Sequence, residues 1–151
     1  MKNLDRRNFL NQSCPLLMSS LIGVVLLKSC SKEDLLETSS IEEGYTISGK
    51  NLIIDLKHSN FSALDNKGWM NFKSQNLLIL KKSKTEYKAF SNRCPHEGFR
   101  NQWTYSESKA SFLCKVHNNS YNTDCETKGN SGVLSCFSTQ LSNTSLTITL
   151  S

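Results

Sequence analysis

Four residues in the second half of the chain carry the side chains best suited to binding a metal. Cys94 and His96 form a C-x-H motif, and Cys114 and His117 form a C-x-x-H motif after 17 intervening residues. Each motif offers one thiolate, which is a soft metal ligand, and one imidazole. The chain has three histidines, and two of them lie in these motifs. The pattern therefore predicts a metal site built from two sulfur and two nitrogen donors.

The spacing inside the first motif indicates that its two donors point the same way. In extended backbone, residues i and i+2 project to one side, so Cys94 and His96 can face a common centre. Pro95 stiffens the link between them, and Gly98 permits a sharp turn with positive φ close to a bound group. Zinc sites use the same donor types but usually pair C-x₂₋₄-C with H-x₃₋₅-H. An iron–sulfur cluster is therefore favoured, and a zinc site is the alternative.

The chain resembles the Rieske iron–sulfur domain family, whose pattern is C-x-H-x-G…C-x-x-H-G-x-x-[FY]. The resemblance implies a [2Fe–2S] cluster in which two cysteines bind one iron and two histidines bind the other. It also implies a small β domain that presents both motifs at one tip. The positions that match the family pattern are Cys94, His96, Gly98, Cys114, His117 and Tyr121.

The chain also departs from this family pattern near the motifs. Phe99 and Val116 stand where high-potential members have the cysteines of a loop disulfide, so that bridge cannot form here. Asn118 replaces a glycine, and asparagine tolerates left-handed backbone. Asn119 replaces a hydrogen-bonding serine, whereas Tyr121 stands where the family has a tyrosine that bonds the first ligand cysteine; a merely packed aromatic is the alternative. We expect a reduction potential in the lower half of the Rieske range of roughly −150 to +300 mV.

Residues 1–29 have the features of an export signal or a membrane anchor. Residues 6–10, Arg-Arg-Asn-Phe-Leu, resemble the twin-arginine pattern, and an apolar run follows from residue 14 to residue 27. As a helix this run would span about 21 Å, which is short of the hydrocarbon core of about 30 Å. We interpret it as a signal first and as a membrane span second. Twin-arginine export carries folded proteins, which suits a cluster assembled where thiols stay reduced.

Cys30 follows Leu27-Lys28-Ser29 in a segment that resembles a bacterial lipobox. The segment predicts a lipidated Cys30, and an unmodified cysteine after an uncleaved anchor is the alternative. Residues 30–43 are acidic and contain Ser and Thr, which predicts a flexible tether. Together these features predict a lipid-anchored domain on the periplasmic or cell-surface side of a bacterial membrane. Positions 30–151 hold 14 basic and 12 acidic residues, a net charge of +2, so nucleic-acid binding is not expected.

Residues 44–151 are predicted to form one all-β domain of Rieske type, an antiparallel sandwich or barrel. Hairpins are expected around residues 49–51 and 81–86, and no helix-length amphipathic stretch is present. Residues 92–122 are expected to be inserted as a small cluster-binding subdomain. The predicted strands cover residues 45–48, 52–56, 77–80, 87–90, 111–114 and 146–150.

The chain has one further cysteine pair and one further histidine. Cys125 and Cys136 are a candidate disulfide in an exported protein, and two free thiols are the alternative. His58 has no ligand-like neighbours in the sequence, so we interpret it as an ordinary strand or turn residue.

These features predict an electron carrier. The family resemblance implies that the histidine-bound iron lies outermost, so electrons would enter and leave next to His96 and His117. No nucleophile, general base or substrate pocket is evident in the sequence. The leading hypothesis is a membrane-tethered one-electron carrier for an extracytoplasmic redox partner such as a cytochrome, an oxidase or a dehydrogenase. The alternatives are a Rieske subunit of a cytochrome bc-type or arsenite-oxidase-like complex, and a structural zinc domain.

Overall fold

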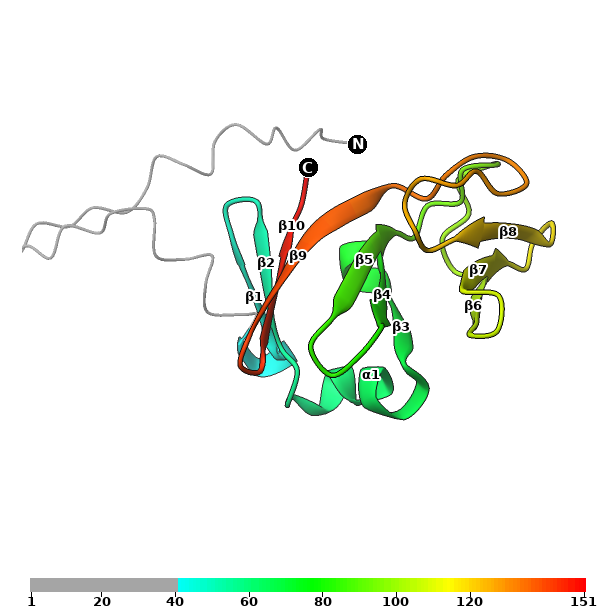
Figure 1. Cartoon of the computed structure of the whole chain (residues 1–151). Coiled ribbons are helices and arrows are strands. Elements are labelled where there is room, and N and C mark those ends of the chain that lie inside the picture. The colour runs from blue at the N-terminus through cyan, green and yellow to red at the C-terminus, as the bar shows by residue number, and fades with distance from the viewer. Residues whose placement is uncertain (1–40) are drawn as a thin grey trace, which may run out of the picture. The chain divides into compact units, whose positions relative to one another are not determined.

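The computed structural model describes residues 41–151, which fold mostly into antiparallel β-sheet (Figure 1). This confirms the all-β prediction. The predicted signal, Cys30 and residues 31–40 of the predicted tether lie outside the described residues. Within residues 41–151, no helix is both long enough and apolar enough to cross a membrane.

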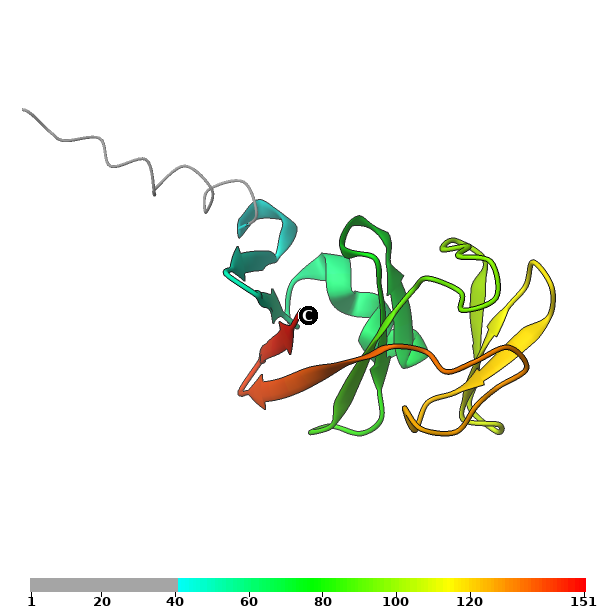
Figure 2. The same cartoon turned by 90° about the horizontal axis from the view of Figure 1, so that it is seen from above.

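The described strands form two sheets. A seven-stranded sheet has the order β1-β2-β10-β9-β5-β4-β3, and a three-stranded sheet has the order β6-β7-β8. Every strand pair in both sheets is antiparallel. Figure 2 shows the three-stranded sheet at the opposite end of the domain from β1 and β10. The strands are β1 Tyr45–Ser48, β2 Asn51–Asp55, β3 Trp69–Phe72, β4 Leu77–Lys81, β5 Tyr87–Ser91, β6 Trp103–Ser106, β7 Ser111–Cys114, β8 Asn119–Asn122, β9 Cys136–Ser142 and β10 Ser145–Thr149.

Short helical segments connect some of the strands. The α-helix α1, Ser62–Lys67, ends at Gly68, which takes a left-handed φ of 74°. No helix-length amphipathic stretch is evident here in the sequence, because a helix of six residues is too short to show a helical period. His58 precedes the 3₁₀ turn Ser59–Phe61, and its Nδ1 accepts the Asn60 amide at 3.3 Å. Two further 3₁₀ turns are Ile41–Glu43 and Lys73–Gln75.

Strand β4 is buried on both faces, which explains its uninterrupted apolar run. Leu77 and Ile79 face a first core, and Leu78 and Leu80 face a second. This alternation follows from the two-residue period of a strand. The first core also contains buried residues from β2, α1, β5 and β10, namely Leu52, Ile54, Leu64, Ala89, Leu146 and Ile148.

The second core lies between the two sheets and is rich in aromatic side chains. Phe112 on β7 is fully buried and makes edge contacts with Trp69, Phe90 and Trp103. Such contacts add to the stabilisation that apolar burial already provides. The same core contains Cys94, Cys114 and Tyr121. The packing that joins the two sheets therefore also positions both cysteines of the predicted site.

A buried amide fixes the chain where it leaves β5 towards the first motif. The backbone N–H of Asn92 donates to the Asn76 carbonyl at 2.9 Å. The backbone carbonyl of Asn92 accepts a hydrogen bond from Trp103 Nε1 at 2.8 Å. Its side-chain Nδ2 donates to Asn71 Oδ1, and its Oδ1 accepts Arg100, both at 3.0 Å. Because a buried polar group is costly unless it is paired, this network specifies one position for the segment that follows.

Candidate metal centre

The first motif lies in a tight loop between β5 and β6. The Cys94 amide donates to the Phe99 carbonyl, and the Gly98 amide donates to the Cys94 carbonyl, both at 2.8 Å. Gly98 has a φ of 80°, and a Cβ at this position would lie 3.2 Å from Nε of Arg93. The loop therefore needs a glycine here for its backbone angle, whereas the flexible Arg93 side chain could move away from a Cβ.

The second motif lies in the turn between β7 and β8. Cys114 ends β7 and pairs with Asn119, the first residue of β8. Asn118 takes a left-handed φ of 54°, which agrees with its tolerance of this conformation. The Lys115 amide donates to the Gln102 carbonyl at 2.7 Å. This bond ties the second loop to the chain that leaves the first loop, so the two motifs are held side by side.

The two cysteines lie inside the second core with free thiols. Cys94 is 2% exposed and Cys114 is 1% exposed. The Tyr121 hydroxyl lies 3.3 Å from Cys94 Sγ. Burial by itself raises the pKa of the Cys94 thiol, but hydrogen bonds from Tyr121, from the His96 amide and from Cys114 bring this pKa below its usual value.

The partners of Cys94 titrate differently. Burial raises the pKa of Cys114, and the neighbouring Cys94 raises it further, although the Val116 and His117 amides oppose this shift. Burial and the bond to Cys94 raise the pKa of Tyr121 to about 12, so its hydroxyl keeps its proton at neutral pH. Cys94 is thus the more easily deprotonated of the two thiols, and the Tyr121 hydroxyl is available to donate to it.

The two histidines face each other at the surface. Nδ1 of His96 lies 3.3 Å from Nδ1 of His117, and their side chains are 38% and 39% exposed. A Glu97 carboxylate oxygen lies 3.9 Å from Nε2 of His96, and the other lies 3.7 Å from Nε2 of His117. Phe99, which is 45% exposed, makes an edge contact with the His117 ring. The histidine edge is therefore open to a partner molecule, and an acidic and an aromatic side chain border it.

Comparison with known proteins agrees with this arrangement. The family model described as the Rieske [2Fe–2S] domain matches residues 55–138, which is more than half of the chain. The chain belongs to the Rieske [2Fe–2S] domain family. Membership implies a [2Fe–2S] cluster.

A solved Rieske protein structure is similar to this Rieske chain. The crystal structure of the cyanobacterial plasma membrane Rieske protein PetC3 from Synechocystis PCC 6803 is similar at 16% sequence identity. The match covers 58% of this chain and 91% of the PetC3 chain, with a TM-score of 0.45. No curated protein matches the chain.

The donor geometry fits the Rieske cluster better than it fits a single zinc ion. Metal–nitrogen bonds of about 2.1 Å in a tetrahedral arrangement place two nitrogens about 3.4 Å apart, close to the 3.3 Å between the histidine Nδ1 atoms. A single tetrahedral ion would hold all four donors within about 4 Å of one another. Within residues 41–151, the donor atoms grouped within 4.8 Å are those of His96, Glu97 and His117, without either cysteine. The sulfur pair and the nitrogen pair are thus separated, as a two-iron group requires.

The loop of residues 125–136 follows β8 in this Rieske domain, and a disulfide between Cys125 and Cys136 joins its two ends. Their Cα atoms lie 5.9 Å apart. The sequence indicated this cysteine pair as a candidate disulfide but indicated no role for Ser131 inside the loop. Ser131 Oγ lies 2.6 Å from the Tyr121 hydroxyl. A lone serine in a loop carries no signal in a single sequence, so only the folded chain reveals this contact.

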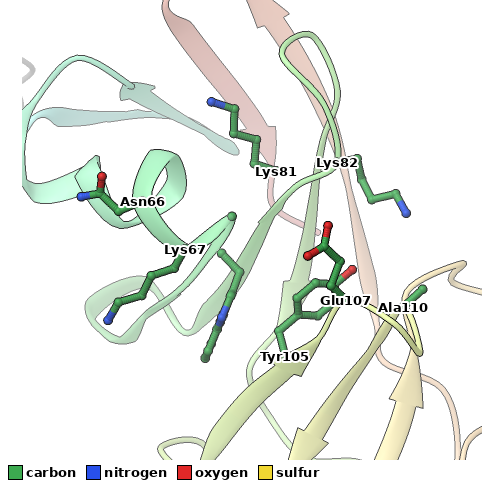
Figure 3. A pocket seen from close by; sticks show the side chains of 9 residues that line it. Asn66, Lys67, Lys81, Lys82, Tyr105, Glu107 and Ala110 are labelled. Atoms are coloured by element: carbon green, nitrogen blue, oxygen red, sulfur yellow. The ribbon is translucent and has the colours of Figure 1, made fainter.

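One pocket of the described residues lies away from the two cysteine–histidine motifs. It has a volume of about 530 Å³ and is bordered by the end of α1, the end of β4 and the turn between β6 and β7 (Figure 3). Lys81, which pairs with Asp65, and Lys82 extend in opposite directions from the end of β4. Tyr105 and Glu107 form the opposite wall. None of the four motif residues lines this pocket.

Proposed function

We propose that this protein is a membrane-tethered one-electron carrier that exchanges electrons with an extracytoplasmic redox partner. Cys94 and Cys114 would hold the inner iron of its cluster, and His96 and His117 would hold the outer iron. The observation that carries the proposal is the 3.3 Å approach between the Nδ1 atoms of two partly exposed histidines, beside two buried free thiols. Sulfur and nitrogen donors sorted in this way suit a cluster that is sheltered on one side and open on the other.

Each part of the site has a separate task in this proposal. When bound, the cluster supplies reversible one-electron oxidation and reduction. The aromatic core around Cys94 and Cys114 excludes water from the sulfur side. The exposed rings of His96 and His117 form the edge where a partner approaches. Phe99 beside them offers a partner an apolar contact of the kind enriched in protein interfaces.

The decisive experiment is spectroscopic and analytical. The purified protein is reduced with dithionite, and its EPR and visible spectra are recorded together with iron, sulfide and zinc contents. We expect a Rieske spectrum with about two irons and two sulfides per chain. Stoichiometric zinc without sulfide would instead support the structural zinc alternative and overturn the proposal.

The reduction potential tests the expected effect of the family departures. We expect a midpoint in the lower half of the Rieske range of roughly −150 to +300 mV, because the loop disulfide and the serine of high-potential members are absent. A redox titration followed by circular dichroism measures it. A midpoint near the upper end would show that other donors compensate for Asn119 and Phe99.

Export and membrane tethering rest on residues 1–30 and need their own test. Replacing Arg6 and Arg7 by lysines is expected to leave the protein in the cytoplasm, because the twin-arginine route depends on this pair. Cys30→Ser is expected to release the exported domain from the membrane fraction. Mass spectrometry of the Cys30 peptide checks for the lipid directly. An unmodified Cys30 in a membrane-bound protein would favour an uncleaved anchor.

A further inference from the structure

A chain of two hydroxyl groups leads from the loop 125–136 to one of the proposed ligands. Ser131 Oγ lies 2.6 Å from the Tyr121 hydroxyl, which lies 3.3 Å from Cys94 Sγ. Tyr121 is fully buried, so no water competes for its hydroxyl in this core. The three atoms form a continuous hydrogen-bonded path that ends on sulfur.

The direction of hydrogen-bond donation along this path follows from which of the three atoms carries a proton. A metal-bound thiolate can only accept a hydrogen bond, so the single proton of the Tyr121 hydroxyl is donated to Cys94. The Tyr121 oxygen is then left as an acceptor, and the proton of Ser131 is donated to it. A hydroxyl that accepts one hydrogen bond becomes a stronger donor of its own. Ser131 therefore strengthens the bond that Tyr121 makes to the sulfur.

The loop that carries Ser131 is held at several points. The Gly129 amide donates to the Gly132 carbonyl at 2.7 Å. The Asn130 amide donates to the Ser120 carbonyl at 3.2 Å, and Asn130 Oδ1 accepts the Ser120 amide at 3.4 Å. A Cβ on Gly129 would collide with the Ser120 carbonyl oxygen, so this close approach requires glycine. The Cys125–Cys136 disulfide closes the loop at its two ends.

The same loop also lies against the first metal-binding loop. A Cβ at Gly132 would lie 3.2 Å from Cβ of Pro95. Val133 and Ser135 line one cleft together with Cys94 and Pro95. The disulfide-closed loop is thus in contact with both the first ligand loop and the tyrosine that bonds it.

We propose that Ser131 is a positioning residue that acts through Tyr121 on Cys94 to raise the reduction potential, and that the Cys125–Cys136 disulfide holds Ser131 in place. This inference rests on the proposed cluster ligation. A stronger donor to the sulfur stabilises the reduced, more negative state relative to the oxidised state. The chain would in this way recover part of the potential that it loses with the family's loop disulfide.

A double-mutant cycle tests the path from Ser131 to Tyr121. The one-electron midpoint is measured for the wild type, Ser131→Ala, Tyr121→Phe and the double variant. We expect Ser131→Ala to shift the equilibrium about threefold towards the oxidised state, and Tyr121→Phe to shift it about tenfold. In the Tyr121→Phe background, Ser131→Ala should add no further shift. An unchanged midpoint for Ser131→Ala, or an equal shift in both backgrounds, overturns the role of Ser131.

Two further measurements test the role of Ser131 separately from the proposed cluster ligation. Ser131→Thr keeps the hydroxyl and is expected to retain the wild-type midpoint; a shift equal to that of Ser131→Ala would point to loop packing instead and contradict the path. A wild-type protein without a Rieske EPR signal would refute the proposed cluster itself. A wild type with that signal but an inert Ser131→Ala would refute only the present inference.

The role of the disulfide has its own test. Replacing Cys125 and Cys136 together by serine is expected to speed amide hydrogen exchange at Gly129 and Asn130 in the cluster-free protein. In the loaded protein the midpoint should shift in the same direction as in Ser131→Ala. Unchanged exchange and an unchanged midpoint would show that the loop stays in place without the disulfide, and would overturn that part of the proposal.

Discussion

The sulfur half and the nitrogen half of the site are held in different ways. Cys94 and Cys114 are almost fully buried in an aromatic core that also joins the two sheets. The side chains of His96 and His117 are more than one-third exposed and contact each other, with Glu97 and Phe99 beside them. The sulfur half is therefore set by packing that the whole domain shares, whereas the nitrogen half is set by two short loops.

Because of this difference, mutations in the two halves should affect different properties of the protein. A change in the core around the cysteines should unfold the domain as well as damage the site. A change at the histidine edge should alter electron exchange while leaving the fold intact, because exposed side chains contribute little to stability. The two halves can thus be perturbed independently, and four predictions follow this contrast from the largest effect to the smallest.

Loss of one proposed ligand from either half should abolish cluster binding. We expect Cys114→Ser and His117→Asn each to reduce the iron content at least about tenfold, since an open coordination position exposes the cluster to water. His58→Asn is the matched control, because His58 lies outside the motifs and serves as a turn residue. Iron and sulfide analysis together with EPR measures the result. Full iron content in Cys114→Ser would remove that cysteine from the ligand set.

The aromatic core should respond far more strongly than the exposed edge. Phe112→Ala leaves a cavity among four aromatic partners and should lower the free energy of unfolding by about 3–5 kcal/mol. Phe99→Ala at the histidine edge should change it by no more than about 0.5 kcal/mol. Urea unfolding of both variants tests the contrast. Similar losses for the two phenylalanines would contradict the division of the site into a packed and an open half.

Sequence reasoning succeeded where chemistry depends on local spacing. The all-β class and the hairpins of β1–β2 and β4–β5 follow from short apolar runs and turn residues, and the structure contains them. Strand β2 begins at Asn51, so the first turn is one residue shorter than predicted. The positive φ at Gly98 and the left-handed Asn118 could also be anticipated, because each follows from one residue in a known pattern.

Features that depend on distant contacts could not be anticipated in the same way. Strands β6 and β8 are short, and their pairing with β7 is what identifies them. Asn92 gains its role only when Asn71, Asn76 and Trp103 meet around it. The contact of Ser131 with Tyr121 spans ten residues and a loop closed by a disulfide, and a single sequence contains no periodic signal for it.

The charge of Glu97 should tune the nitrogen half without affecting the fold. Its carboxylate lies within 4 Å of Nε2 on both histidines, so it disfavours the extra electron that reduction brings to this edge. Glu97→Gln should raise the midpoint potential by about 10–40 mV, a small shift because the carboxylate is half exposed. The shift should shrink at high salt because the charge is screened. If Glu97→Gln and the wild type have the same midpoint potential at low salt, the carboxylate does not affect the histidine edge.

The smallest effect is expected at Asp124, which directly precedes the disulfide-closed loop 125–136. Hydrogen bonds from the Thr127 side chain and from the Glu126 and Thr127 amides lower its pKa to about 2. A lowered pKa means that the stabilisation is complete above the usual value of 3.8 and is lost as the pH falls through about 2. Asp124→Asn should therefore be slightly less stable than the wild type at pH 7, and this difference should shrink between pH 4 and pH 2. Thermal unfolding across this range measures it, and Thr127→Val, which removes the hydroxyl bond, should show part of the same loss.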